Sequence, residues 1–230
     1  MKFNKTVLSP STLVGLSFPL LGMPLWNFIA GTWLQSMDRF QRAALGSLIT
    51  VGLALGVVAV VVWWEKKPLS ELGLHRQTRR KIIVALAASI VIAVGGTLIS
   101  LLILKVFALP APTLITERIA IFPLWFSVWL VGSSSVAEEV LYRGFVIERL
   151  GQTTGNICLG ALITLIWFTF LHLPLGVVYT LTIVLPGSIL VTALYVWRRD
   201  LIATIVVHLV FNAPIIVLSL LPILANQMTR

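Results

Sequence analysis

The sequence predicts an all-α membrane protein, a polytopic bundle of seven to eight transmembrane helices. Hydrophobic residues make up 58% of the 230 residues, charged residues only 11%, and the mean hydropathy is +1.02. Apolar stretches without charge recur along the chain, and none shows the alternation that is typical of a barrel strand. Because a spanning helix needs about 20 apolar residues and satisfies its own backbone hydrogen bonds, only helices suit these stretches.

The expected helices follow the uncharged stretches in order. These are Thr6–Met37, Ala43–Trp64, Ile82–Leu104, Ile119–Ala137, Leu150–Trp197 and Leu201–Thr229. The fifth stretch has room for two helices, which gives the count of seven to eight. The first runs past Pro19 and Pro24 without a small-residue cleavage site, so we expect a retained helix rather than a signal peptide. Residues 1–230 should form one integral membrane domain, with a motif-bearing core at about 119–224.

Basic residues outnumber acidic ones by 17 to 8, but they do not gather in a soluble domain that would bind nucleic acid. The densest group lies between the second and third expected helices, in the segment 65–81, and cytoplasmic loops carry such an excess of Lys and Arg. We therefore expect this loop and the amino terminus, with Lys2 and Lys5, in the cytoplasm. Alternating helices then place Arg149 and the pair 198–199 on the same side. The single cysteine, Cys158, excludes a disulfide within the chain.

Few polar residues lie inside the apolar stretches or directly beside them. Three charged residues follow the end of the fourth stretch. Glu138 and Glu139 are adjacent, and Arg143 follows them. On a helix Glu139 and Arg143 share a face, whereas Glu138 is turned about 100° away from Glu139. We expect Arg143 to hold Glu139, which leaves Glu138 facing an intramembrane cavity as a group that can take and return a proton.

Two histidines also lie in apolar stretches, each with a neighbour four residues away. Phe168 precedes His172, and Asn212 follows His208. Alone, each of these residues could serve packing or an interhelical hydrogen bond, and the Glu–Arg pair could be a structural salt bridge. Together they make a set of ionisable groups on three helices, and such groups are costly inside a membrane and mark functional sites.

These residues carry a resemblance to a known family. The ordered set Glu138-Glu139-x-x-x-Arg143, Phe168-x-x-x-His172 and His208-x-x-x-Asn212 resembles the three motifs of the CAAX-protease and bacteriocin-processing family, the type II CAAX endopeptidases. The words Tyr142-Arg-Gly-Phe145 and Glu71-Leu-Gly-Leu74 are similar as well, and every motif position is filled. The resemblance implies an intramembrane peptidase with its site below the cytoplasmic surface, in contact with membrane lipid and acting on membrane-associated peptides or proteins. From the small size of the chain we expect a prokaryotic cell membrane.

Two mechanisms fit this set of residues. With zinc, Glu138, His172 and His208 would be the ligands and Glu139 the base. Without metal, Glu138 would activate water, the histidines would bind that water, and Asn212 with one histidine would stabilise the oxyanion. Arg143 and Glu139 would then support the site. The sequence leaves both mechanisms open, and it leaves open whether the substrate is prenylated.

Two other functional classes fit part of the pattern. A proton-coupled membrane carrier could use buried Glu, Arg and His as a relay, although carriers usually show repeat symmetry and here the polar residues gather in one half of the chain. A non-catalytic immunity or scaffold protein could keep the same fold and motifs. Replacing Glu138 by Gln separates a scaffold or immunity protein, whose function rests on binding and would survive the change, from a protease or a carrier. A flux assay then separates the carrier from the protease.

Overall fold

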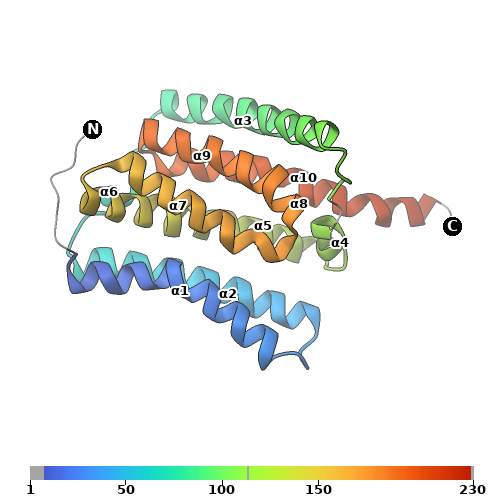
Figure 1. The fold of residues 1–230 in the computed structure, drawn as a ribbon, viewed down its shortest axis with the longest axis horizontal. Coiled ribbons are helices and arrows are strands. Elements are labelled where there is room, and N and C mark those ends of the chain that lie inside the picture. Colours follow the sequence, from blue (N-terminus) through green and yellow to red (C-terminus); the bar gives the residue numbers. More distant parts are fainter. Residues whose placement is uncertain (1–7, 113, 229–230) are drawn as a thin grey trace.

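The protein was analysed as a computed structural model that describes residues 8–112 and 114–228, and every regular element in these ranges is a helix (Figure 1). The all-α prediction is therefore confirmed. Lys2 and Lys5, and the outermost residues of the first and last predicted helices, Thr6 and Thr229, lie outside the described ranges.

The described residues form long and short α-helices, π-helical segments and 3₁₀ turns. The long α-helices are α1 (Pro10–Thr32), α2 (Arg39–Ala59), α3 (Arg79–Val106), α5 (Leu124–Glu138), α7 (Ile157–His172), α9 (Leu185–Arg198) and α10 (Leu201–Met228). The short ones are α4 (Leu114–Ala120), α6 (Glu148–Thr154) and α8 (Val177–Tyr179). Three π-helical segments, η1 (Val60–Trp64), η3 (Glu139–Ile147) and η5 (Thr180–Val184), continue α2, α5 and α8, and two 3₁₀ turns, η2 (Leu69–Leu72) and η4 (Leu173–Leu175), lie in connections.

Five helices among the described residues are long and apolar enough to cross a membrane, by length and composition. They are Pro10–Thr32, Arg39–Trp64, Arg79–Val106, Ile157–Leu175 and Val177–Arg198. An integral membrane protein is thus supported, and the stretch Leu150–Trp197 does hold two helices. The predicted count of seven to eight is not confirmed.

The largest departure from the predicted helices concerns the fourth one. It was expected from Ile119, but the chain breaks after α4 and α5 begins at Leu124, directly after Pro123. Proline has no N–H to donate and disfavours a helical conformation in the residue before it, so the helix restarts there. The apolar part of this helix is therefore reduced to the residues of α5 that precede Glu138, where the charged motif starts.

The helices surround η3 at the centre of the bundle. In Figure 1 the α1–α2 pair lies on one side and α3 on the other, with α5, α7, α9 and α10 between them. All nine residues of η3 are buried, and the segment contacts α1, α2, α5, α7 and α10. The polar motif thus occupies the middle of the bundle rather than its lipid-facing surface.

Two glycines let backbones approach η3 closely. A Cβ atom at Gly160 of α7 would lie 2.7 Å from Gly151 N and 2.9 Å from Ile147 O. One at Gly144 would lie 3.0 Å from the Leu72 carbonyl oxygen. These contacts fix α7 and the η2 turn against the helix that carries the two glutamates, because no side chain fits between the backbones.

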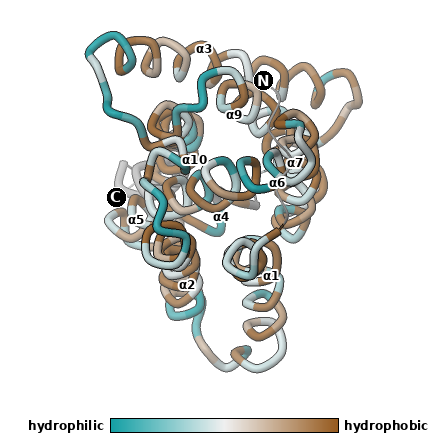
Figure 2. Tube along the Cα trace, turned by 90° about the vertical axis from the view of Figure 1, so that its left-hand side faces the viewer, coloured by the Kyte–Doolittle hydropathy of each residue, from teal (hydrophilic) through white to brown (hydrophobic). Residues whose placement is uncertain are grey.

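Charged residues join three connections at one end of the bundle. Arg149 pairs with Glu65 and lies 3.7 Å from Glu71, while Arg199 pairs with Glu148. We call these five residues the basic-end cluster. Its end of the molecule, where α1, α7 and α10 start in Figure 1, faces the viewer in Figure 2, which shows hydrophilic segments in front of mostly hydrophobic helices.

Further contacts in the basic-end cluster hold the start of α10. The Tyr195 hydroxyl donates to Glu148 Oε1 at 2.6 Å, and the Leu201 N–H donates to the Gly73 carbonyl at 2.9 Å. Gly73 has a φ of +78°, which favours glycine. The three basic segments that the sequence assigned to a common side, around 65–81, 149 and 198–199, therefore lie at one end.

Candidate active site

Glu138 and Glu139 lie where α5 passes into η3. In a π-helix the backbone bonds run over five residues rather than four, and such segments often occur at functional sites. The two carboxylates have different surroundings. The Glu139 side chain is completely buried, whereas the Glu138 side chain is 20% exposed.

Glu139 is bound from two sides. Arg143 Nη1 lies 2.9 Å from Glu139 Oε1, and His208 Nδ1 lies 2.8 Å from the same oxygen. Arg143 also packs its guanidinium over the Phe168 ring, 4.5 Å from the centroid. The Glu139–Arg143 pair has the geometry that the spacing predicted, and the contact with His208 adds a link from η3 to α10.

His172 is held by its own helix and by the turn that follows it. Its Nδ1 atom lies 2.8 Å from the Phe168 carbonyl oxygen, and its ring lies against the Phe168 ring at 4.3 Å between centroids. The Thr180 hydroxyl donates to the His172 carbonyl at 2.7 Å. Because Nδ1 is hydrogen-bonded to the Phe168 carbonyl, the other ring nitrogen, Nε2, faces Glu138.

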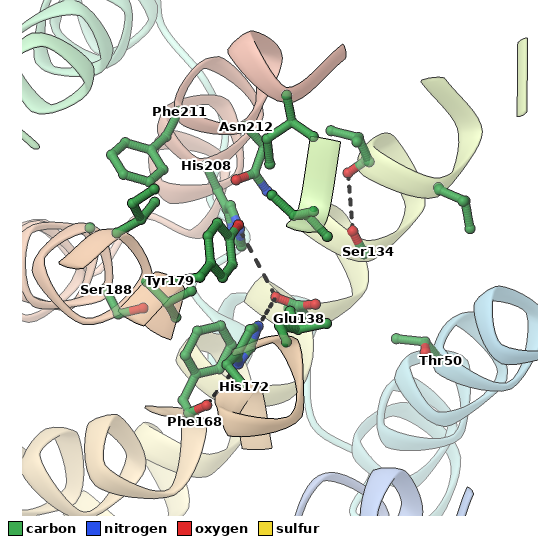
Figure 3. A pocket seen from close by; sticks show the side chains of 18 of the residues that line it. Thr50, Ser134, Glu138, Phe168, His172, Tyr179, Ser188, His208, Phe211 and Asn212 are labelled. Atoms are coloured by element: carbon green, nitrogen blue, oxygen red, sulfur yellow. Dashed lines mark hydrogen bonds and ion pairs between the residues drawn. The ribbon is translucent and has the colours of Figure 1, made fainter. Parts of the chain in front are cut away.

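Glu138 lies between the two histidines. Its Oε2 atom is 4.0 Å from His172 Nε2 and 4.0 Å from His208 Nε2 (Figure 3). The three side chains come from α5, α7 and α10. The structure thus brings the residues of the three motifs together, and we call Glu138, Glu139, Arg143, His172 and His208 the central cluster.

The hydrogen bonds of the histidines fix what they present to Glu138. A backbone carbonyl and a carboxylate only accept hydrogen bonds, so Nδ1 of each neutral ring must carry the hydrogen. Each Nε2 then directs a lone pair towards Glu138 Oε2, which is itself an acceptor when ionised. Three acceptors that face one another favour a hydrogen-bond donor or a cation between them, and a water molecule can donate to two of the three.

The donor set agrees in its chemistry with a zinc site. Zinc-binding histidines usually donate their other N–H to a carboxylate or a carbonyl, as His208 and His172 do here. Among the described residues, however, no three His, Cys, Asp or Glu side chains lie close enough to hold a metal ion as they are placed. Zinc bonds of about 2.0–2.1 Å bring tetrahedral ligands to roughly 3.3 Å from one another, which is closer than the observed 4.0 Å.

The surroundings of Glu139 bear on its predicted role as the base of a zinc mechanism. Its carboxylate is completely buried and bound by Arg143 and His208. No surface of the side chain reaches the space in which Glu138 and the histidines meet. Glu139 is placed to orient other groups, and Glu138 is the carboxylate that faces the cavity.

Asn212 lies one turn beyond His208 on α10. Its Nδ2 atom donates to Ser135 Oγ at 3.2 Å, and Ser135 is completely buried in α5. The side chain lines the same cavity as Glu138. One amide hydrogen is thus anchored, and the second remains for a group in the cavity.

Two cavities meet at the central cluster. The larger has a volume of about 430 Å³ and includes Glu138, His172, His208 and Asn212, with a mostly apolar wall from α2, α9 and α10. The smaller, of about 310 Å³, extends towards Asn27 and Arg118. Both are lined by Glu138 and His172, so these two residues stand where an extended ligand would pass from one cavity into the other.

Sequence reasoning missed two residues of this site. Ser135 orients Asn212, and Tyr179 lines the larger cavity beside His208 and Glu138 (Figure 3). Ser135 lies in a run of three serines that gave no reason to choose among them. Tyr179 lies in an apolar stretch without a polar partner at helical spacing, so no signal in the sequence marked it.

A comparison with protein families identifies a match over the site. Residues 120–214 match the family model described as type II CAAX prenyl endopeptidase, Rce1-like. The matched range contains all three motifs, from Glu138 to Asn212. No curated protein and no solved structure matches the chain.

Proposed function

We propose that this chain, whose residues 120–214 match the family model described as type II CAAX prenyl endopeptidase, Rce1-like, is an intramembrane endopeptidase in which Glu138 activates water. Its substrates are peptides or proteins associated with the membrane. The observation that carries the proposal is the position of Glu138 Oε2, 4.0 Å from both His172 Nε2 and His208 Nε2 at the junction of two cavities.

The mechanism starts from a water between these three groups. The water donates its hydrogens to Glu138 and to one Nε2 lone pair, which leaves an oxygen lone pair for the carbonyl carbon of the substrate. Glu138 takes a proton as the water attacks, and it returns the proton to the nitrogen that leaves as the C–N bond breaks. The free N–H of the Asn212 amide donates to the oxyanion.

The remaining motif residues position these groups. Glu139 holds the His208 ring through Nδ1, and Arg143 holds Glu139. Phe168 holds His172 through its carbonyl group and its ring. A zinc ion, where bound, would be held by Glu138, His172 and His208 and would supply Lewis-acid activation of the water; the observed spacing favours the mechanism in which water alone occupies the space.

We further propose that the basic end of the bundle faces the cytoplasm. The segment 65–81 carries the densest group of Lys and Arg, and it shares this end with Arg149 and with Arg198 and Arg199 at the end of α9. Positive residues on the cytoplasmic side are the general rule for short loops. Substrates then reach the central cluster through cavities with mostly apolar walls, which suits segments that are already in the lipid.

The proposal is tested by peptide hydrolysis in proteoliposomes. The probes are two internally quenched peptides that end in a CAAX sequence, one farnesylated and one not, and the products are identified by mass spectrometry. The wild type should release product, and Glu138→Gln should lower kcat by about 10²–10⁴-fold, as expected for loss of a general base. Lys66→Gln, a change in the basic loop, is the matched control and should keep wild-type activity.

The same preparations separate the alternatives. Wild-type activity that withstands chelation supports the metal-free mechanism, whereas activity lost with a chelator and restored by zinc supports the metal mechanism. Proton flux that depends on Glu138, without hydrolysis of either peptide, would instead identify a carrier. A protective or binding function unchanged in Glu138→Gln, again without hydrolysis, would identify a scaffold or immunity protein.

A further inference from the structure

Tyr179 is a buried tyrosine whose hydroxyl has no hydrogen-bond partner among the residues that the structure describes. The residue is 7% exposed, and it lines the larger cavity. The other two tyrosines differ, because Tyr142 donates to the Pro19 carbonyl at 3.2 Å and Tyr195 donates to Glu148 at 2.6 Å. Buried tyrosine hydroxyls usually find a partner in the protein. The Tyr179 hydroxyl is thus free to donate to a ligand in the cavity.

The backbone on both sides fixes where the Tyr179 ring points. Gly176, with a φ of +116°, turns the chain from η4 into α8, a conformation that side chains disfavour. The Thr180 hydroxyl then binds the His172 carbonyl at 2.7 Å, so the residue next to Tyr179 is tied to the catalytic histidine. Figure 3 shows the Tyr179 ring pointing into the cavity beside His208 and Glu138.

We propose that Tyr179 is a catalytic residue that donates a hydrogen bond to the oxyanion of the tetrahedral intermediate. The inference rests on the proposed peptidase function. Asn212 offers one free N–H, because its other hydrogen is bound by Ser135. Oxyanion sites commonly use more than one donor, placed where the charge develops. Tyr179 supplies a second donor from α8, beside His208 and Glu138 in the same cavity.

The reaction with Tyr179 included is balanced without a further reactant. The water oxygen forms a bond to the carbonyl carbon, and the electron pair of the C=O bond moves to oxygen, where the Tyr179 O–H and the Asn212 N–H bind it. Glu138 takes the water proton. When the C–N bond breaks, the carbonyl re-forms and Glu138 protonates the leaving nitrogen, while Tyr179 keeps its own proton throughout.

The test is Tyr179→Phe, which removes only the oxygen atom. The variant is compared with the wild type in proteoliposomes on whichever CAAX peptide the wild type cleaves, with kcat and KM measured separately and thermal unfolding recorded. Loss of one oxyanion donor should lower kcat by about 10²–10³-fold. KM should change by less than about 3-fold, because the bond forms only in the transition state. Unfolding should be unchanged, since the hydroxyl binds no described residue.

Tyr195→Phe is the matched control. It removes the hydroxyl of another buried tyrosine, which is bound to Glu148 at the basic end. This variant should melt at a lower temperature, by the loss of one hydrogen bond to a charged group, and should keep kcat within about 3-fold of the wild type.

Several results would overturn the inference. A Tyr179→Phe protein with wild-type kcat would do so, and so would one that melts well below the wild type, because its hydroxyl would then have a structural partner. A wild type that is active and inactivated by Glu138→Gln, together with an active Tyr179→Phe, refutes the role of Tyr179 and leaves the peptidase function standing. A wild type that cleaves neither peptide refutes both.

Discussion

The central cluster and the basic-end cluster both contain buried pairs of opposite charge, but only the central cluster also directs a carboxylate into a cavity. In the basic-end cluster Arg149 forms an ion pair with Glu65, and Arg199 forms one with Glu148. In the central cluster Arg143 and His208 bind Glu139 in the same manner. Only there does a further carboxylate, Glu138, face a cavity together with two imidazole lone pairs.

The comparison shows that a buried charge does not by itself mark a catalytic site. Buried ion pairs can serve structure alone, and removing one partner is costly wherever the pair lies. What distinguishes the central cluster is the carboxylate of Glu138, which faces a cavity and lies 4.0 Å from the Nε2 atoms of two histidines rather than against an arginine. We therefore expect changes in the central cluster to act mainly on kcat and changes in the basic-end cluster to act mainly on stability.

The largest effect on stability is expected from Arg149→Leu. The Arg149 and Glu65 side chains are 2% and 5% exposed, so the change leaves a buried carboxylate without its partner. Such a loss costs about 3–5 kcal/mol. Denaturant or thermal unfolding in detergent measures this loss of unfolding free energy. The control is Lys67→Leu, which removes a half-exposed pair with Glu71 and should cost about 0–1 kcal/mol. Equal effects of the two variants would contradict a structural role for the basic-end cluster.

An intermediate effect, on catalysis, is expected from Glu139→Gln. The change keeps the side-chain volume but weakens the bond that orients the His208 ring. It also removes the charge that pairs with buried Arg143, so the melting temperature is recorded beside kcat. Groups that orient a histidine in this manner typically contribute about 10–100-fold to activity. The measurement is kcat on the cleaved CAAX peptide. Glu71→Gln, the same change at a half-exposed carboxylate, is the control. If Glu139→Gln kept full kcat, the account of how His208 is positioned would be wrong.

The smallest effect is expected from Gly160→Ala, which tests how α7 is held against η3. The added Cβ atom would lie 2.7 Å from Gly151 N and 2.9 Å from Ile147 O, so the backbones must separate. Overpacking of this kind costs about 1–3 kcal/mol. Gly52→Ala serves as the control, because a Cβ atom there meets nothing within 4 Å. Alanine is the better helix former by about 1 kcal/mol, so that variant should gain stability. Thermal unfolding of both variants decides the point.

Much of the fold could be predicted from the sequence because lipid offers no hydrogen bonds to backbone N–H and C=O groups, so a membrane-spanning segment must satisfy them itself. Uncharged stretches had to be helices, and α1, α2, α3 and α7 lie within or close to the predicted ranges. The fourth helix was predicted to start at Ile119, but Pro123 interrupts the chain and α5 begins at Leu124. The predicted count of seven to eight spanning helices is not confirmed, because α5 has only 15 residues and the segment that follows it is charged.

The site was predictable where spacing along one helix decides a contact. Arg143 meets Glu139, and Phe168 meets His172, because residues four apart share a face. The bond between Glu139 and His208 joins residues far apart in the sequence, as does the pair of Glu65 with Arg149. Such contacts depend on how helices pack against each other, and helical periodicity does not contain that information. Tyr179 was missed for the same reason.

The measurement that tests the central claim most directly compares Glu138→Gln with Glu148→Gln, the same chemical change in the two clusters. For both, kcat on the cleaved CAAX peptide and the melting temperature are measured in the same lipid. We predict that Glu138→Gln loses about 10²–10⁴-fold in kcat and melts as the wild type does, whereas Glu148→Gln melts earlier and keeps kcat within about 3-fold while it is folded. A Glu138→Gln protein that still cleaves the peptide, or a folded Glu148→Gln protein that is equally inactive, would contradict the account.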